Sequence, residues 1–222
     1  MKNHKVKELT EFLNKRYTER HLLYGKDVKS LGWGNEEQQT YRFKNTLSQS
    51  IDFSNKRILD IGCGYGDYLN YIKTNNQTLN FKSYKGYDIN DHFIKTAKKI
   101  YSNEKRADFE VNDILFTENH TLKNNFDLGI MLGLLNLNFK NKVDNYVYSK
   151  NMIKSAFKKL NEVLIVDFLS IYRTEKYEKE DFVFYYDPSR IIKIISELTS
   201  NFVINHNYSP IPQKEFMIFI YK

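Results

Sequence analysis

Residues 57–67 read RILDIGCGYGD, and this segment decides the fold. The apolar run at 57–62 predicts a buried strand, and DYLNYIKTN at 67–75 predicts a helix. Three glycines stand between these two elements: Gly62, Gly64 and Gly66. Because glycine has no Cβ atom, the backbone there can turn sharply and approach a ligand closely. A buried strand that leads through a glycine-rich turn into a helix is the first unit of an α/β fold.

The same alternation of strand and helix continues along the chain. We predict further strands at 81–89, 107–113, 126–132 and 162–168, and further helices at 91–103, within 141–160 and from Asp187 to about Leu198. The last two predicted strands, 201–208 and 214–222, are too close in sequence for a crossover helix, so they must be antiparallel. The pattern therefore predicts a doubly wound, seven-stranded, mostly parallel sheet with an antiparallel terminal strand. Such sheets bind ligands at the carboxyl ends of their strands.

The N-terminal part has a different, helical pattern. Apolar residues recur at helical spacing within 3–17, which predicts an amphipathic helix. Asn35 is a suitable N-cap for a second helix that runs to about Ser50. No repeat, low-complexity tract or Pro/Gly-rich linker interrupts the chain. We expect one domain over 1–222, with a helical lid at 1–54 and the α/β core at 55–222.

Composition excludes several classes of protein. The 222 residues are 41% hydrophobic and 15% aromatic, which is enough for a buried core and excludes a disordered chain. The apolar runs are far shorter than the roughly 20 residues that span a bilayer, and the N-terminus lacks an apolar signal core, so we expect a cytoplasmic protein. Cys63 is the only cysteine, so an intrachain disulfide and a four-cysteine zinc site are excluded, and we expect no metal site.

The net charge of +7 leaves a nucleic-acid partner open but does not favour it. Only 7 of the 34 basic residues are arginine, which is the usual bidentate reader of phosphate and guanine. The lysines are dispersed along the chain and are typical of a solvated surface.

Two carboxylates indicate the chemistry of the ligand. Asp88 ends the second predicted strand, where a carboxylate can accept hydrogen bonds from a ribose diol. The glycines are spaced G-x-G-x-G and not G-x-G-x-x-G, and Asp60, immediately before the loop, would repel a pyrophosphate. A carboxylate at that position attracts an ammonium group instead. These features favour a ribose-bearing ligand with a cationic amino-acid end over NAD.

In these motifs the chain resembles the class I (Rossmann-like) S-adenosylmethionine-dependent methyltransferases. The likeness covers about residues 55–222, with LDIGCGYG as first motif, YDIND at the second strand and NDI at the third. It implies that Asp60 holds the amino group of S-adenosylmethionine, Asp88 its ribose and Asp113 the adenine amino group. It implies further cofactor contacts from Gly62, Cys63, Gly64, Gly66, Ile89, Ile114 and Leu132. Read without the resemblance, Cys63 is a small filler in the loop and not a nucleophile.

A narrower resemblance concerns the segment before the first motif. LGWGNEEQQTYRF at 31–43 is similar to the upstream segment of a bacterial subgroup of these enzymes. It implies that Trp33, Gln39 and Arg42 cover the cofactor and that Arg42 meets its carboxylate. The alternative for Arg42 is an ion pair with a carboxylate of the protein itself.

The methyl acceptor is less defined by the sequence. We expect its binding face to come from the N-terminal helices, the loop at 132–138, the segment 171–187 and the end of the sixth strand. His206 and Tyr208 at that strand end are candidate catalytic residues, with His206 as general base; the alternative is a strand-end histidine bonded to the backbone. The expected function is methyl transfer to O or N of a small molecule, with S-adenosylhomocysteine as product. An RNA methyltransferase and a non-catalytic cofactor-binding partner subunit are the alternatives, and the sequence indicates no oligomeric state.

Overall fold

The computed structural model describes residues 3–75, 80–116, 125–140, 142–172, 178–207 and 215–222. Its helices are α1 (Asn3–Tyr24), α2 (Glu36–Asn45), α3 (Asp67–Asn75), α4 (Asp91–Ile100), α5 (Asn145–Phe157) and α6 (Pro188–Ser196). Its strands are β1 (Arg57–Ile61), β2 (Ser83–Asp88), β3 (Ala107–Val111), β4 (Phe126–Met131), β5 (Leu160–Leu169), β6 (Phe202–Asn205) and β7 (Glu215–Tyr221).

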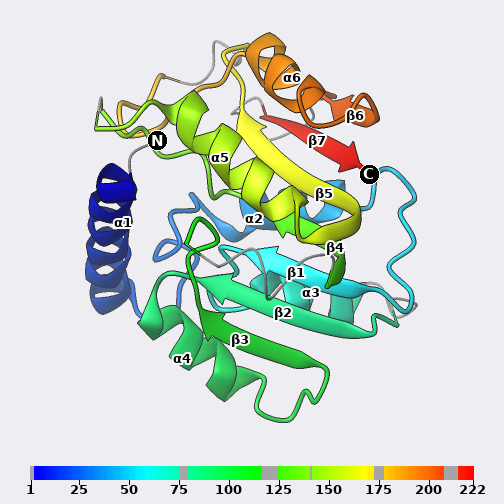
Figure 1. Ribbon diagram of the computed structural model, residues 1–222. Coiled ribbons are helices and arrows are strands. Elements are labelled where there is room, and N and C mark those ends of the chain that lie inside the picture. Colours follow the sequence, from blue (N-terminus) through cyan, green and yellow to red (C-terminus); the bar gives the residue numbers. More distant parts are fainter. Residues whose placement is uncertain (1–2, 76–79, 117–124, 141, 173–177, 208–214) are drawn as a thin grey trace.

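The seven strands form one sheet in the order β3-β2-β1-β4-β5-β7-β6 (Figure 1). The pairs of neighbours from β3 to β5 are parallel, whereas β7 is antiparallel to both β5 and β6. The predicted mostly parallel sheet with an antiparallel terminal strand is therefore confirmed. The strand order reverses between β1 and β4, and the carboxyl ends of those strands mark the place where such sheets bind ligands.

Each face of the sheet carries its own hydrophobic core. Alternate residues of the strands point to opposite faces, so Ile58 of β1 belongs to one core and Leu59 to the other. Residues of α2, α3 and α4 pack into the core around Ile58, and residues of α5 and α6 pack into the core around Leu59. Figure 1 shows α5 in front of the sheet, with α2 and α3 behind it. The central parallel strands β1, β4 and β5 are largely buried on both faces, which explains their apolar sequences, whereas the edge strand β3 is mostly exposed.

The same alternation places three acidic residues on the face that α2 covers. Asp60 has the parity of Ile58, Asp167 has the parity of Val163 and Ile165, and Glu215 has the parity of Met217. All three are buried, and α2 places Arg42 against two of them. This arrangement follows from strand register and helix packing and is not visible as a local sequence pattern.

Helix α1 is longer than predicted, and its Leu9 and Leu13 join the core that α5 and α6 cover. It extends to Tyr24, where Gly25 has a φ of 63° and its N–H donates to the carbonyl of His21, an ending typical of a helix with a C-terminal glycine. Figure 1 shows α1 beside the edge of the sheet to which β1 and β2 point. Within the described residues, no helix combines the length and apolar character needed to cross a membrane.

The second helix begins as predicted and ends earlier. The side chain of Asn35 accepts a hydrogen bond from the N–H of Gln38 and so caps the start of α2. The helix ends at Asn45, and the Thr46 hydroxyl that follows donates to the carbonyl of Phe43. A hydroxyl that bonds the preceding turn competes with continuation of the helix.

Candidate functional site

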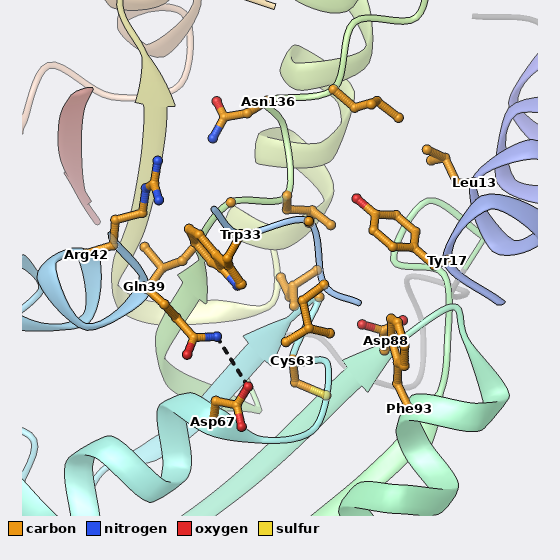
Figure 2. A pocket seen from close by; sticks show the side chains of 18 of the residues that line it. Leu13, Tyr17, Trp33, Gln39, Arg42, Cys63, Asp67, Asp88, Phe93 and Asn136 are labelled. Atoms are coloured by element: carbon orange, nitrogen blue, oxygen red, sulfur yellow. Dashed lines mark hydrogen bonds between the residues drawn. The ribbon is translucent and has the colours of Figure 1, made fainter. Parts of the chain in front are cut away.

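A cavity of about 710 Å³ opens at the carboxyl edge of the sheet. Its floor is the turn between β1 and α3 with the ends of β2 and β4, and its walls are α1, the segment 31–43 and residues 180–183. Figure 2 shows Trp33, Gln39 and Arg42 on one side of this space and Leu13 and Tyr17 of α1 on the other. Its volume lies within the range of roughly 300–1,000 Å³ that is usual for small-molecule sites.

The turn between β1 and α3 needs glycine for its backbone. Gly62 and Gly64 have φ values of 77° and 55°, which disfavour other residues. The N–H groups of Gly62 and Cys63 both donate to the carbonyl of Tyr87 at 2.7 and 3.0 Å, which fastens the turn to β2. A Cβ atom on Gly62 would lie 2.7 Å from Leu134, a lining residue of the cavity. The glycine at this position therefore keeps the floor of the cavity clear.

Asp60 is a buried carboxylate at the floor of the cavity. Its side chain accepts a hydrogen bond from the Tyr84 hydroxyl. Burial raises the pKa of Asp60 to about 7, against the lowering effect of that bond, and the nearby carboxylates of Asp88 and Asp67 raise it further. A cationic group in the cavity would stabilise the ionised form. This is the property that the predicted contact with an ammonium group requires.

Asp88 at the end of β2 organises the glycine turn as well as facing the cavity. One carboxylate oxygen accepts from the N–H of Gly64 at 3.0 Å, and the other accepts from the N–H of Asn90 at 2.8 Å. Burial raises its pKa to about 6, and these backbone hydrogen bonds oppose the rise. The carboxylate is thus held in one orientation at the cavity wall, where a ribose diol is predicted.

Asp113 connects the loop after β3 to α1. It accepts hydrogen bonds from the Thr10 hydroxyl at 2.6 Å and from the N–H of Leu115 at 2.9 Å. Ile89 and Ile114 line the same end of the cavity as Asp88 and Asp113. Two carboxylates beside two branched apolar side chains form a suitable surround for a flat base with an attached ribose.

The segment 31–43 covers the opposite side. Gln39 donates to the carboxylate of Asp67 at 3.2 Å, and Figure 2 shows this contact below Trp33. The guanidinium of Arg42 lies over the ring of Trp33, with its Cζ atom 4.5 Å from the centroid of the ring. An added Cβ on Gly133 would lie 2.6 Å from the Trp33 ring, so the ring packs directly on the loop after β4.

Arg42 forms ion pairs within the protein. Its Nε atom is 3.0 Å from Asp167, and its Nη2 atom contacts Glu215. Asp167 also accepts from the N–H of Gly133 at 2.6 Å. The guanidinium is therefore neutralised by buried carboxylates, as in the alternative reading of the sequence, and its contact with a cofactor carboxylate stays a prediction.

The structure gathers nearly all predicted cofactor-binding residues around one cavity. The lining contains Trp33, Gln39, Arg42, Asp60, Gly62, Cys63, Asp88, Ile89, Asp113, Ile114 and Leu132, whereas Gly64 and Gly66 are not part of it. Gly64 and Gly66 shape the turn from behind: the Gly64 N–H bonds to Asp88, and the Gly66 carbonyl accepts from the Tyr101 hydroxyl. Cys63 is buried, and burial raises the pKa of its thiol, as expected of a filler residue and not of a nucleophile.

The two candidate catalytic residues are not brought into the cavity by the described part of the chain. The ring of His206 packs edge-on against Tyr172 and Phe216, and His206 is not a lining residue. Tyr208 lies outside the described residues. Their catalytic role remains a prediction without a supporting contact. Among the described residues, no group of three or more histidine, cysteine or acidic side chains is placed to hold a metal ion.

Sequence reasoning missed several lining residues. Helix α1 contributes Leu13, Arg16, Tyr17 and Arg20. The predicted helix ended at Tyr17 and so left out Arg20. The spacing of these four residues is nevertheless that of one helix face. The N-terminal helices, the loop at 132–138 and the segment 171–187 were expected to form the acceptor-binding face, which stays a prediction; the two latter segments line the cavity through Asn136, Leu137, Phe182 and Val183.

Comparisons with known proteins identify the family of the chain. A family model described as "Methyltransferase domain" matches residues 52–203. A candidate methyltransferase of Invertebrate iridescent virus 6, 235L, is 30% identical over 190 residues, which are 83% of this chain. The chain spans 66% of the length of that viral protein, slightly less than two thirds.

Solved structures show the same fold. The magnesium protoporphyrin IX methyltransferase ChlM of Synechocystis PCC 6803 with bound S-adenosylhomocysteine matches at a TM-score of 0.64 and 14% identity, covering 98% of this chain and 99% of ChlM. The small RNA methyltransferase HEN1 matches at a TM-score of 0.62 and 17% identity, covering 84% of this chain and 26% of HEN1. At these identities the likeness concerns the fold alone.

Proposed function

This chain belongs to the class I methyltransferases, and from that premise we propose that it transfers the methyl group of S-adenosylmethionine to an O or N atom of a small molecule bound in the cavity. One observation carries the choice of a small acceptor. Besides the residues assigned to the cofactor, the lining includes the apolar side chains of Leu137, Leu169, Phe182 and Val183, which we take as the apolar end of the cavity. A confined apolar space of this kind suits a compact acceptor better than a nucleic-acid strand.

The cofactor would lie across the floor of the cavity. Asp60 would accept from its ammonium group, and Asp88 would accept from its ribose hydroxyls. Asp113, with Ile89 and Ile114, would bind the adenine. In this pose the amino-acid end extends beneath Trp33, and the methyl group faces the apolar end.

The protein's own contribution would be binding, alignment and exclusion of water. The cofactor supplies an activated sulfonium methyl group, so a well-aligned nucleophile is the main requirement. Helix α1 and the segment 31–43 enclose the cavity from two sides. A strong general base in the cavity is not required by this proposal, in keeping with the position of His206 outside the lining.

An RNA acceptor is the second candidate. It is favoured by the net charge of +7 and by the likeness of the fold to HEN1, whose name states a small RNA substrate. The likeness to ChlM, whose name states a porphyrin substrate, favours a small molecule instead.

Two measurements test the proposal. Titration calorimetry with S-adenosylmethionine, S-adenosylhomocysteine and NAD should show micromolar binding of the first two and none of NAD. Labelled methyl transfer should then be followed into a small-metabolite extract and, in parallel, into total RNA. Label in the metabolite fraction that is lost in the Asp88→Ala variant supports the proposal. Label confined to RNA, or binding of NAD alone, contradicts it.

A further inference from the structure

Helix α1 presents one face to the cavity, opposite the segment 31–43. Leu13, Arg16, Tyr17 and Arg20 all line the cavity, and their spacing of three and four residues places them on one side of the helix. Figure 2 shows Leu13 and Tyr17 across the cavity from Trp33 and Arg42. The face combines an apolar residue with a hydroxyl and two guanidinium groups.

Tyr17 directs its hydroxyl into this space, as Figure 2 shows. Its ring is held edge-on against Phe93, with 6.1 Å between the ring centroids. Within the described ranges, the Tyr17 hydroxyl has no hydrogen-bond partner. Burial raises the pKa of Tyr17, so the group is a protonated donor at neutral pH. A donor held in this way is available to a ligand.

Arg16 is the cavity arginine whose charge remains available. The guanidinium of Arg20 donates to the carbonyl of Lys29, and Arg42 pairs with Asp167 and Glu215. The half-buried Arg16 has no hydrogen bond or ion pair to any residue that the structure describes. A partly desolvated guanidinium favours a carboxylate or a phosphate, which it can bind through two parallel hydrogen bonds.

Most of the rest of the acceptor end is apolar or already bonded, and the acidic Glu180, which also lines the cavity, has a contact of its own within the protein. Leu134, Leu137, Phe182 and Val183 supply apolar surface. The side-chain oxygen of Asn136 accepts from the N–H of Leu169 at 3.0 Å. The polar groups of α1 therefore remain to determine how an acceptor is oriented.

We propose that the acceptor is a small molecule with an apolar body and an anionic group, and that Arg16 and Tyr17 bind that anionic group, a carboxylate or a phosphate. The proposal rests on the proposed function, because it places this subsite beside the bound cofactor. It assigns to α1 the selection of the acceptor in addition to covering the cavity.

The test uses the full chain saturated with S-adenosylhomocysteine. Trp33 is the only tryptophan and lines the cavity, so its fluorescence reports ligand entry. The probes are benzoate, octanoate and phenyl phosphate, each compared with a neutral partner: benzamide, octanamide and phenol. We expect the anions to bind saturably and about tenfold or more tightly than their partners, and more weakly as salt increases.

Variants assign the effect to the named side chains. Arg16→Gln should weaken anion binding about tenfold and leave the affinity for S-adenosylhomocysteine unchanged, and Tyr17→Phe should weaken it several-fold. The matched control is Lys15→Gln, which removes the same charge from an exposed position of α1 outside the lining and should have no effect. Equal binding of acids and neutral partners, no binding of any anion, or an unchanged Arg16→Gln variant overturns the proposal. Failure of the protein to bind S-adenosylhomocysteine at the outset would instead contradict the proposed function.

Discussion

Two buried aspartates line the cavity, and the ligand is expected to bind the carboxylate of each. Asp60 and Asp88 both have pKa values raised by burial, to about 7 and about 6. Their nearest partners differ, because Asp60 accepts from the Tyr84 hydroxyl and Asp88 accepts from two backbone N–H groups. A raised carboxylate pKa beside a cavity is typical of a functional position.

The first prediction concerns the pH dependence of cofactor binding. Asp60 must be ionised to hold an ammonium group, and its pKa of about 7 in the free protein means that it is mostly protonated at pH 6. The affinity for S-adenosylhomocysteine should therefore rise about tenfold between pH 6 and pH 8. Calorimetry across this range measures the effect. The Asp60→Asn variant should bind S-adenosylhomocysteine weakly, and its affinity should change little between pH 6 and pH 8. Equal pH dependence in the two proteins would assign the titration to another group.

The second prediction concerns Asp88. Asp88→Ala removes the predicted ribose contacts and leaves the N–H of Gly64 without its acceptor. We expect the affinity for S-adenosylhomocysteine to fall by about 1–3 kcal/mol, or roughly ten- to a hundredfold. The matched control is Asp108→Ala. This variant removes an exposed carboxylate of the edge strand β3, which pairs with Lys85 of β2, and it should leave binding unchanged. An unchanged affinity in Asp88→Ala would show that the second-strand acid does not contact the cofactor.

The sequence predicts the position of a side chain when the position follows from the local strand or helix, and not when it depends on contacts between distant segments. Asp60 and Asp88 were predictable because Asp60 is the last residue but one of β1 and Asp88 is the last residue of β2, and the ends of parallel strands meet at one edge. The pairing of Arg42 with Asp167 and Glu215 was not, since it joins a helix to two distant strands. No sequence pattern singled out Tyr17, and only the folded position of α1 shows that its hydroxyl faces a cavity.

At the scale of elements, α1 is attached to the methyltransferase core through polar contacts near the cofactor motifs. Asn90 caps α4 by accepting from the N–H groups of His92 and Phe93. Its amide nitrogen also donates to the side chains of Asn14 and Thr18 on α1, both at 2.8 Å. Because Asn90 follows Asp88 by two residues, the second-strand motif and α1 are structurally connected.

The third prediction tests this connection. Asn90→Ala removes a helix cap and the buried hydrogen bonds to α1, so the free energy of unfolding should fall by about 2–4 kcal/mol. The matched control is Asn35→Ala, which removes the exposed cap of α2 and should cost only about 1 kcal/mol. Urea unfolding measures both, and hydrogen exchange should quicken across α1 in Asn90→Ala alone. Equal costs with unaltered exchange would show that Asn90 does not hold α1.

Element types were predictable here, whereas some element ends were not. The start of α2 at Asn35 and of α6 at Asp187 and Pro188 followed from local capping chemistry. The end of α1 was not marked by its apolar periodicity, because Arg16 and Arg20 replace apolar residues on the face toward the cavity. Polar residues that line a cavity interrupt the apolar pattern from which a helix is recognised.

At the scale of the whole molecule, the cluster of Arg42, Asp167 and Glu215 joins α2 to β5 and β7. All three side chains are buried, and one guanidinium faces two carboxylates. Burial raises the pKa of Glu215 to about 8, and the neighbouring Asp167 adds to the rise while Arg42 opposes it. With Glu215 protonated the cluster is neutral, and ionisation of Glu215 leaves one buried negative charge unbalanced.

The last prediction follows from the sign of this shift. The pKa of Glu215 is higher in the folded protein than the ordinary 4.5, so between these values the folded state binds more protons than the unfolded state. The contribution of Glu215 to stability is therefore present at low pH and is lost as the pH rises toward 8, by up to about 1.4 kcal/mol per pH unit. Asp60 and Asp88 act in the same direction, so wild-type stability alone cannot isolate Glu215. Urea unfolding of Glu215→Gln at pH 5.5 and pH 8.5 should show a smaller loss of stability with rising pH than the wild type, because the amide cannot ionise. An equal loss in the two proteins would mean that Arg42 keeps Glu215 ionised throughout and that the cluster carries a net negative charge.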